Sequence, residues 1–455
     1  MKKRMYKIMA LAMTAAMVVP MAAQTTAFAA DDKEITYWNI AVESPDKDIV
    51  TAAVDKFNKE TESGYTVNSV AIQNDTYKEK LVIAMSSGEC PDMYSSWSGG
   101  PMYEYIDSGF AQPIDDLLDQ SDIKDKLLDA AIEQGSYKGH VYAVPYLNVI
   151  LAGIFYNKDM FKQYGLEEPK TLADLENICA TLKENGITPF ALANASKWTG
   201  SMYFMSLAAR YGGLEPFQNA VAGTGKFTDD CFIKAGEKIQ EWVNNGYFPD
   251  GVNSLSEDDG QAKQLMYQET AGMMLGGSFY IGAFQTDSEE FYQKIGWFPF
   301  PAIDDSDADP TIQIGTVGDQ FISFNCEGDK LAAAFECAAD HLSDEVEDMI
   351  YSTGKIAPVK DAKDHIKDPV VKEIFDAAQE ASSIQLWYDQ YLPTSVASAH
   401  LDGLQEVFGL TKTPQEAQEE MQKAMDEYLS TKSDSDAADD TAEEATDDAA
   451  ADDAE

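Results

Sequence analysis

The chain has 455 residues, of which 79 are acidic and 33 basic, and its formal net charge is −46. A chain of this length is expected to form about two domains. The excess of acidic residues argues against nucleic acids and anionic lipids as partners, because both require clustered Lys and Arg, and it leaves neutral polar ligands open.

Residues 1–30 have the pattern of a secretory signal peptide. Four basic residues within the first seven positions precede an apolar run over 8–21, and Ala27-Phe28-Ala29 provides a small-x-small cleavage site. We therefore predict an exported protein that is extracellular, associated with the cell surface or periplasmic. No later apolar run reaches the roughly 18 residues that a membrane span needs, so the mature chain is predicted to be soluble.

The five cysteines are too few for a disulfide framework in a chain of this size. Their number is odd and no C-x-x-C pair occurs, so we expect them to be buried small apolar side chains. The first is Cys90, far beyond the apolar run, and the lipobox cysteine of bacterial lipoproteins is therefore not seen. At the other end, residues 433–455 contain only Ser, Asp, Ala, Thr and Glu, with eleven acids, and are predicted to be a disordered tail.

The first elements of the mature chain alternate between strands and helices. The spacing of apolar residues predicts strands at 35–38 and 65–72, each followed by a helix, over 50–57 and 77–85. A third strand is predicted at 91–94 and opens into a loop of small and polar residues. Strand ends that open into such loops are where α/β proteins bind ligands.

The stretch from Gly139 to Phe161 predicts a passage between two lobes. Val141–Val144 alternates like a strand, which we expect to end at Pro145 because proline lacks the N–H of a ladder hydrogen bond. Val149–Phe155 is an apolar run typical of a central parallel strand buried on both faces, and Asn157 is placed to cap the helix after it. Two strands without a helix between them most simply carry the backbone from one α/β lobe into another. Small ligands usually bind in the cleft between lobes.

The rest of the chain continues the alternation. Thr171 with Asp174, and Thr413 with Glu416, have the spacing of capping boxes at two helix starts. The glycine-containing segment 311–324 is strand-like on both sides of its turn and predicts a second passage between lobes. The remaining predicted strands lie at 189–193, 271–275 and 295–300, and the remaining predicted helices include 198–211 and 232–243.

Seven motifs follow one another along the chain in the order found in one family. They are ITYWN, LVIAMSSGECPDMYSSW, IDSGFAQPIDDLL, YKGHVYAVPY with IFYNKDMFKQYGLEEPKTLADL, ETAGMMLGGSF, QLWYDQYLP and TPQEAQEEMQKAMDE. By these motifs, residues 33–430 resemble the extracellular solute-binding proteins of ATP-driven (ABC) sugar importers, of the maltose-binding-protein type. The most specific motif is YNKDMF followed by G-L-x-x-P-K-T-x-x-D-L.

The resemblance implies an α/β fold of two lobes, the type II periplasmic-binding-protein fold, with a ligand cleft that closes by hinge bending. It implies a first lobe of residues 31–148 plus 312–352 and a second lobe of 149–311 plus 353–432. The implied function is capture of a neutral carbohydrate, a sugar or oligosaccharide, and its delivery to the membrane permease subunits of an ABC importer. A monomer with no cofactor and no catalytic residue is expected.

A sugar offers apolar C–H faces and a rim of hydroxyls, so its site needs aromatic rings and polar side chains that bind hydroxyls. Phe279 stands where the family usually has a stacking tryptophan, which makes that surface smaller. Trp387 and Asp389 are expected on one side of an extended segment. Any of these aromatic residues could instead belong to the core, and any of the polar ones to a turn. The predicted ligand-binding residues are Trp38, Asn39, Glu43, Asn74, Trp97, Trp198, Phe279, Tyr280, Asp319, Gln320, Trp387 and Asp389.

Two other functions remain open from the sequence. Two carboxylates across a sugar site could cleave a glycosidic bond in a secreted carbohydrate-active enzyme, but no H-E-x-x-H, G-x-S-x-G or P-loop motif is present. The same fold could also bind a non-sugar solute such as a peptide, although tryptophan with few basic residues favours sugar. The acidic loop 304–309 lacks the glycine and glutamate of a calcium loop, so no metal site is predicted.

Overall fold

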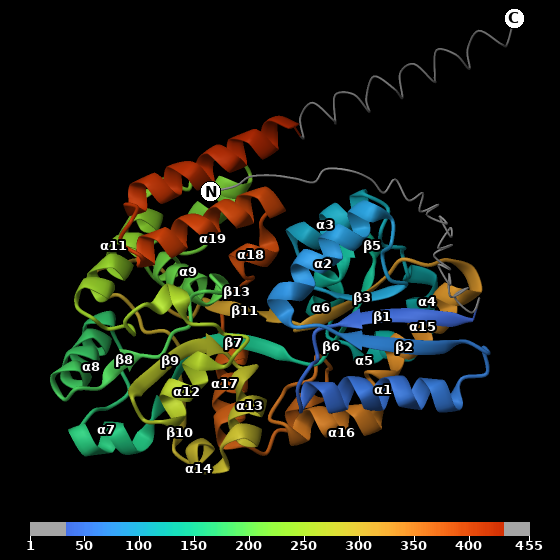
Figure 1. The fold of residues 1–455 in the computed structure, drawn as a ribbon, viewed down its shortest axis with the longest axis horizontal. Helices are drawn as coiled ribbons and strands as arrows, with labels where there is room; N and C mark the ends of the chain where they lie inside the picture. Colours follow the sequence, from blue (N-terminus) through green and yellow to red (C-terminus); the bar gives the residue numbers. More distant parts are fainter. Residues whose placement is uncertain (1–32, 432–455) are drawn as a thin grey trace, which may run out of the picture.

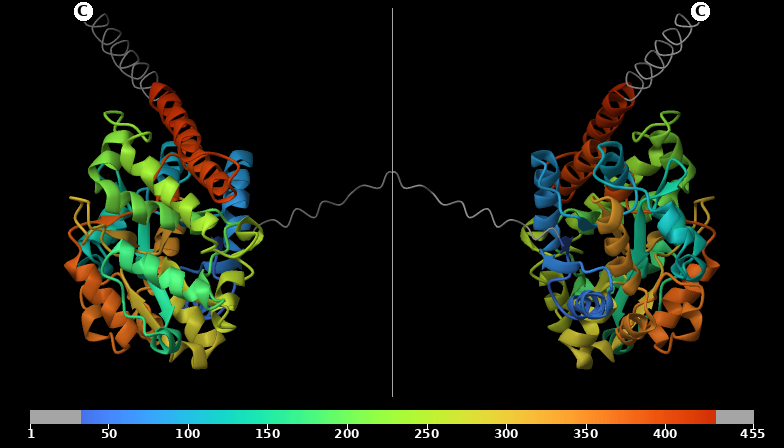
Figure 2. Two further views of the ribbon diagram at one scale, coloured as in Figure 1. Left: turned by 90° about the vertical axis from the view of Figure 1, so that its left-hand side faces the viewer. Right: turned by 90° about the vertical axis from the view of Figure 1, so that its right-hand side faces the viewer.

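The computed structural model describes residues 33–431. The predicted signal peptide at 1–30 and the predicted tail at 433–455 lie outside the described residues. The chain forms two halves side by side, each built on a mixed sheet with helices packed around it (Figure 1). In the side views of Figure 2, the helix over residues 414–431, in red, lies on the outer surface.

The first half contains a five-stranded sheet. In order across the sheet, its strands are β2 (Thr66–Ala71), β1 (Glu34–Asn39), β3 (Met93–Ser96), β12 (Gln320–Phe324) and β6 (Ala143–Tyr146). The pairs of β1 with β2 and β3 are parallel, and those of β12 with β3 and β6 are antiparallel. A separate hairpin joins β4 (Ser136–Tyr137) and β5 (His140–Val141). The helices are α1 (Asp46–Glu60), α2 (Asn74–Ser87), α3 (Gly100–Asp107), α4 (Asp115–Asp119), α5 (Ile123–Lys126), α6 (Asp129–Gln134), α15 (Gly328–Asp340) and α16 (Asp344–Ser352).

The second half contains a six-stranded sheet. In order, its strands are β13 (Ile384–Gln385), β11 (Gln313–Val317), β7 (Val149–Asn157), β9 (Ala271–Gly277) and β8 (Thr188–Phe190), and β10 (Ile295–Phe298) pairs with the end of β7 beyond β11. The helices are α7 (Lys158–Tyr164), α8 (Leu172–Glu184), α9 (Trp198–Gly212), α10 (Glu215–Val221), α11 (Asp230–Asn244), η1 (Val252–Ser254), α12 (Gln261–Tyr267), α13 (Tyr280–Asp287), α14 (Glu289–Tyr292), α17 (Pro369–Glu380), α18 (Tyr388–Tyr391) and α19 (Thr394–Phe408). The short helix η2 (Ala362–Asp364) follows residues 358–360, which pair with residues 126–128 of the first half.

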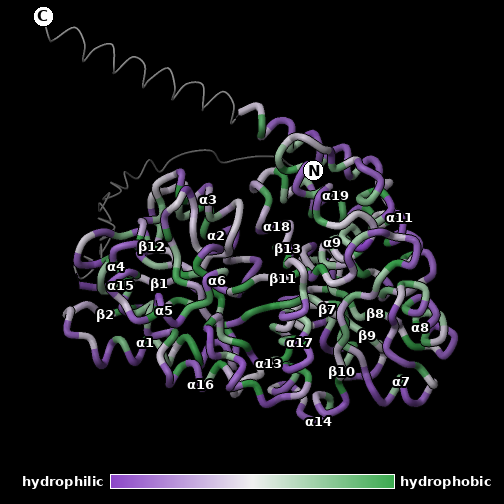
Figure 3. Tube along the Cα trace, turned by 180° about the vertical axis from the view of Figure 1, so that it is seen from behind, coloured by the Kyte–Doolittle hydropathy of each residue, from purple (hydrophilic) through white to green (hydrophobic). Residues whose placement is uncertain are grey.

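Local sequence signals account for most of these elements. The α1 residues predicted to share one face, Val50, Ala53, Val54 and Phe57, are all buried. Asn157 caps α7, and both predicted capping boxes form, at Thr171 and at Thr413. Hydrophobic stretches, green in Figure 3, follow the strands inside each half, and hydrophilic ones lie mostly on the outer helices and loops. No helix within residues 33–431 is long and apolar enough to cross a membrane.

Two strand predictions need correction. All nine residues of β7 are buried, as expected, but its partners β9, β10 and β11 are antiparallel to it rather than parallel. An apolar run reports burial on both faces and carries no information about the direction of its neighbours. The strand β6 also continues through Pro145, because β6 is a sheet edge that pairs only with β12 and leaves one side without ladder bonds.

The chain crosses between the halves at three points. Leu147-Asn148 joins β6 to β7, and Gly318-Asp319 joins β11 to β12, so both predicted passages are present. Gly318 has φ +133°, a conformation that favours glycine at this sharp crossing. The third crossing lies between residue 365 and α17, because residues 358–360 still pair with residues 126–128 of the first half. The segment after α16 also runs beside the first crossing, where the Ile356 amide donates to Asn148 Oδ1 at 2.8 Å.

The strand pairing bears on the predicted lobe boundaries. The pairing of β11 with β7 of the second half favours a boundary later than residue 312. Residues 358–360 pair with residues 126–128 of the first half, which favours a boundary later than residue 352. We propose a first lobe of 33–148 plus 318–365 and a second lobe of 149–317 plus 366–431.

All five cysteines are free. Cys179, Cys231 and Cys337 are buried, as predicted, whereas Cys90 and Cys326 are partly exposed.

Candidate ligand-binding site

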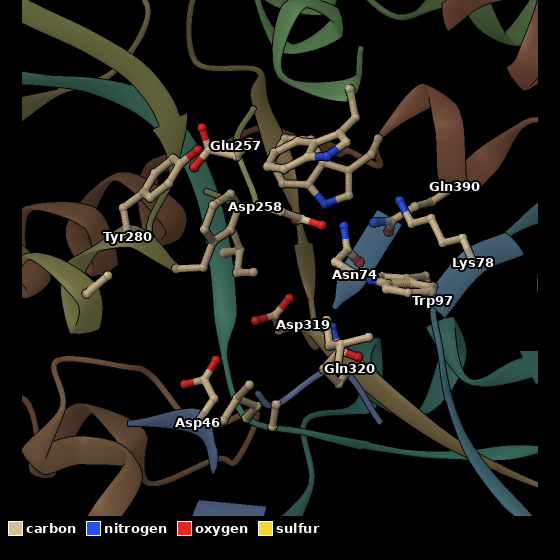
Figure 4. Close-up of a pocket in the computed structure, with 18 of the residues that line it drawn as sticks. Asp46, Asn74, Lys78, Trp97, Glu257, Asp258, Tyr280, Asp319, Gln320 and Gln390 are labelled. Atoms are coloured by element: carbon tan, nitrogen blue, oxygen red, sulfur yellow. The ribbon is translucent and has the colours of Figure 1, made fainter. Parts of the chain in front are cut away.

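A cavity of about 280 Å³ lies between the two halves. Segments that follow β1 and β3, together with the start of α2, line it from the first half. The start of α9, the start of α13 and the residues around α18 line it from the second half. Figure 4 shows Trp97 and Lys78 on one side of the open space and Tyr280 on the other. Each half alone thus carries only part of the lining.

The structure brings ten of the twelve predicted residues to this cavity. They are Glu43, Asn74, Trp97, Trp198, Phe279, Tyr280, Asp319, Gln320, Trp387 and Asp389. They come from segments as far apart in the sequence as residues 43 and 389, so only the packing of the two halves assembles them. Their role in binding remains a proposal.

Trp38 and Asn39 do not line the cavity. Asn39 is buried, its Nδ2 donates to Ser69 Oγ at 2.8 Å, and its Oδ1 accepts from the Ala41 amide at 3.0 Å. Its polar atoms are thus used to hold the end of β1. Trp38 packs against the small cluster that contains Tyr77 of α2. Both residues were predicted from their position at the end of the strand, whereas the lining begins one residue later, at Ile40.

Aromatic rings form two walls of the cavity. Trp97 contacts Tyr77 edge to face, with 6.0 Å between ring centroids, and the Lys78 ammonium lies 5.0 Å from its ring centroid. On the second half, Trp198 meets Phe279 edge to face at 6.0 Å. Rings held by such contacts present fixed apolar faces to a ligand.

The Trp387 segment is helical where an extended conformation was predicted. Trp387 is the N-cap residue of α18 and Asp389 lies in its first turn, so the period-two argument is wrong. Both side chains still line the cavity. Trp387 is only 5% exposed and belongs to the core of the second half, and Asp389 pairs with Lys78 of the first half at 3.6 Å.

Several lining residues were missed from the sequence. Among them are Asp46, Lys78, Glu257, Asp258 and Lys263. Lys78 lies one helical turn after the predicted Asn74, and that spacing was an available signal. Glu257 and Asp258 precede α12 in a loop that no motif marks, and only the fold brings them to the cleft.

The charge of the lining is negative. Six carboxyl groups face the cavity, from Glu43, Asp46, Glu257, Asp258, Asp319 and Asp389, against the ammonium groups of Lys78 and Lys263. Burial raises the pKa of Glu257 to about 8, so this carboxyl is protonated at neutral pH, and the other five still outnumber the two ammonium groups. Asp46 is paired with Lys355 at 2.5 Å. An anionic ligand would meet repulsion here, whereas neutral hydroxyls would find acceptors.

Three buried polar atoms of the lining have no hydrogen-bond or ion-pair partner among the described residues. They are Trp198 Nε1, Glu257 Oε2 and Gln320 Oε1. Such atoms cost free energy unless something pairs with them. A bound group that both donates and accepts would satisfy all three.

Replacing Asp319 with asparagine is expected to stabilise the protein and to weaken ligand binding. Burial raises the pKa of Asp319 from 3.8 to about 6, and nearby Lys355 opposes the rise. Between these two pKa values the native carboxyl keeps a proton that the unfolded chain has lost, so wild-type stability falls as the pH rises through this window. The stability gain of Asp319→Asn should therefore grow up to about pH 6 and then stay constant.

Urea unfolding at several pH values, with Glu62→Gln as an exposed control, measures this difference. Equal stability of the variant and the wild type at every pH would show that Asp319 is not a desolvated carboxyl. Ligand calorimetry on the same samples reports the expected loss of affinity.

Comparison with known proteins identifies the family. Residues 41–339 match the family model of bacterial extracellular solute-binding proteins. The chain belongs to this family. An uncharacterized ABC transporter extracellular-binding protein of Pyrococcus horikoshii is 31% identical over 228 residues, 50% of each chain. The maltotriose-binding protein of Pyrococcus abyssi is 28% identical over 241 residues, 52% of this chain and 48% of that one. The chain thus spans about half the length of the curated relatives it matches.

Two solved structures match over a longer range. A structure from work on xylan utilization by Caldanaerobius polysaccharolyticus has a TM-score of 0.79 and 29% identity, and the match covers 86% of this chain and 99% of that one. A chitin oligosaccharide binding protein also has a TM-score of 0.79, with 23% identity over 87% and 98% of the two chains. These matches confirm the two-lobed α/β fold predicted from the motifs.

Proposed function

We propose that this solute-binding protein captures a neutral sugar or short oligosaccharide outside the cytoplasm and delivers it to the permease of an ABC importer. The observation that carries the proposal is the cavity between the halves, which combines fixed aromatic faces with unpartnered buried polar atoms. Family membership supports export and solute capture. The named relatives that bind maltotriose or chitin oligosaccharides support the sugar class.

The chemistry of a sugar fits the lining. Its C–H faces pack against indole and phenyl rings, as Trp97 and Phe279 offer. Each hydroxyl both donates and accepts, so one ring of hydroxyls pairs with the Trp198 N–H and with the oxygens of Gln320 and Glu257. The negative lining disfavours uronates and other acidic sugars.

The cavity also limits the size of the ligand. Its volume, about 280 Å³, is slightly below the range of roughly 300 to 1,000 Å³ for ligand pockets. We expect a ligand of one or two sugar rings. Two stacked rings and a few charge-assisted hydrogen bonds then give an affinity near micromolar, about −8 kcal/mol.

A neutral sugar is expected to raise the melting temperature of the mature protein and to remain chemically unchanged. The panel consists of galactose, maltose, xylobiose and N,N′-diacetylchitobiose, with glucuronate as the acidic control. Thermal shift and titration calorimetry report binding, and chromatography of the recovered sugar reports turnover. Cleavage products would support the enzyme alternative, and stabilisation by glucuronate alone would contradict the neutral-ligand class.

The partner and the oligomeric state follow from the same proposal. When the two halves close, both of them can face one permease at the same time. A single copy of the chain is sufficient for this, so we expect a monomer. Light scattering on the purified mature protein measures the mass, and a dimer at micromolar concentration would contradict the monomer.

A further inference from the structure

The loop between η1 and α12, residues 255–260, reaches from the second half toward the first. Its turn is held by its own hydrogen bonds. The Gly260 amide donates to the Glu257 carbonyl at 2.7 Å, and the Ser256 amide donates to Gln261 Oε1 at 2.7 Å. The two acids at 257 and 258 therefore keep a set orientation relative to each other.

Asp258 contacts the opposite half. Its Oδ2 accepts from the backbone amide of Asp75 at 3.3 Å. Asp75 is the second residue of α2, and the N-cap residue of that helix, Gln73, makes no capping bond with its side chain. An open amide at a helix N-terminus favours a carboxylate through the hydrogen bond and the positive end of the helix dipole. Asp258 of the second half thus caps the N-terminus of α2, which belongs to the first half.

The same contact includes an opposing charge. Burial and the nearby carboxylate of Asp75 raise the pKa of Asp258, whereas Lys78 lowers it. The strength of the contact therefore depends on the α2 amide, which attracts Asp258, and on the Asp75 charge, which repels it. Substitutions can change it in either direction.

Glu257, the preceding residue, faces the cavity. It is 9% exposed, lies beside the Tyr280 hydroxyl in Figure 4, and its Oε2 has no hydrogen-bond partner among the described residues. Glu257 and Asp258, which are neighbours in one turn, thus point in two different directions. Glu257 points to the place of the ligand and Asp258 to the other half.

We propose that the 255–260 loop couples ligand binding to closure of the cleft: Glu257 hydrogen-bonds the ligand, and Asp258 holds the loop to the N-terminus of α2. A ligand that orders Glu257 also orders Asp258, and closure in turn keeps Glu257 against the ligand, as linkage requires. The Glu257 part rests on the proposed sugar-binding function. The Asp258 part needs no ligand.

Small-angle scattering of the ligand-free mature protein tests the Asp258 contact. Asp258→Ala removes the oxygen that accepts from the Asp75 amide and is expected to increase the radius of gyration through a larger open population. Asp75→Asn keeps the backbone amide and removes the repelling charge, so it is expected to decrease or preserve that radius. Asp259→Ala, an exposed neighbour in the same turn, is the matched control and should match the wild type.

Calorimetry with whichever of the four panel sugars binds the wild type most tightly tests the coupling. Asp258→Ala and Glu257→Ala should each bind roughly ten-fold more weakly, because each loses a hydrogen-bonding group. Glu257→Ala should keep the wild-type radius of gyration without ligand, and Asp75→Asn should bind as tightly as the wild type or more tightly. Melting curves of all variants identify any that fail to fold, and Asp75→Asn still tests the contact if Asp258→Ala is one of them.

Three results would overturn the proposal. They are a wild-type radius for Asp258→Ala, an unchanged affinity for Glu257→Ala, and a loss of affinity in Asp75→Asn as large as that in Asp258→Ala. If no sugar binds the wild type, the proposed function fails, while the scattering experiment still decides the Asp258 contact.

Discussion

Replacing Gly100 with alanine is expected to weaken ligand binding by about 5- to 150-fold, the range of ordinary coupling energies, while both halves stay folded. Gly100 begins α3 in the first half, next to α18 of the second. A Cβ atom at Gly100 would lie 2.2 Å from the Leu392 carbonyl oxygen and 2.5 Å from its carbon. These are backbone atoms, which cannot rotate aside as a side chain can. The arrangement of the halves in this structure therefore has no room for the methyl group.

Gly100 is a sharper test than its neighbour Gly99. A Cβ at Gly99 would also meet backbone, 2.1 Å from the Gln390 oxygen, but Gly99 has φ +110°, so a side chain there would strain the first half by itself. Gly100 has no such constraint. Its replacement should act mainly on the contact between the halves.

Calorimetry, scattering and thermal melts of Gly100→Ala, beside Ser108→Ala at the other end of α3, separate the possible outcomes. Weaker binding with a more open shape is the expected result. A large fall in melting temperature with an unchanged radius of gyration would instead indicate that α18 packs against the first half in every conformation of the protein.

Replacing Trp387 with alanine is expected to lower the free energy of unfolding by about 3 to 5 kcal/mol. Its side chain is 5% exposed and packs in the core of the second half, so its removal leaves a cavity. Binding should weaken as well, because Trp387 also lines the ligand cavity. The sequence had posed core and ligand contact as alternatives for this residue, and the structure places it in both environments.

Trp97→Ala is the matched comparison. Trp97 is only partly buried and lies at the margin of a small cluster in the first half. Loss of one stacking ring should weaken binding by roughly two- to ten-fold, with a much smaller loss of stability. Urea unfolding curves and calorimetry on both variants give the two quantities. Equal stability losses for both variants would contradict the difference in burial on which this prediction rests.

Sequence alone determined the local elements and the kind of fold. Caps such as Thr171 with Asp174, apolar stripes such as that of α1, and the strand-to-strand passages act over a few residues, so they can be read from spacing. The family motifs extended this reading to two lobes, and ten of the twelve candidate residues chosen from the sequence line one cavity in the structure.

Tertiary structure alone decided how distant segments meet. The direction of the partners of β7, the edge position that accommodates Pro145, and the helical turn at Trp387 depend on chains that arrive from elsewhere in the sequence. The pairing of Asp258 with α2 is of the same kind, since it joins residues 183 positions apart. Spacing along a chain reports which face a residue occupies, whereas packing decides what that face meets.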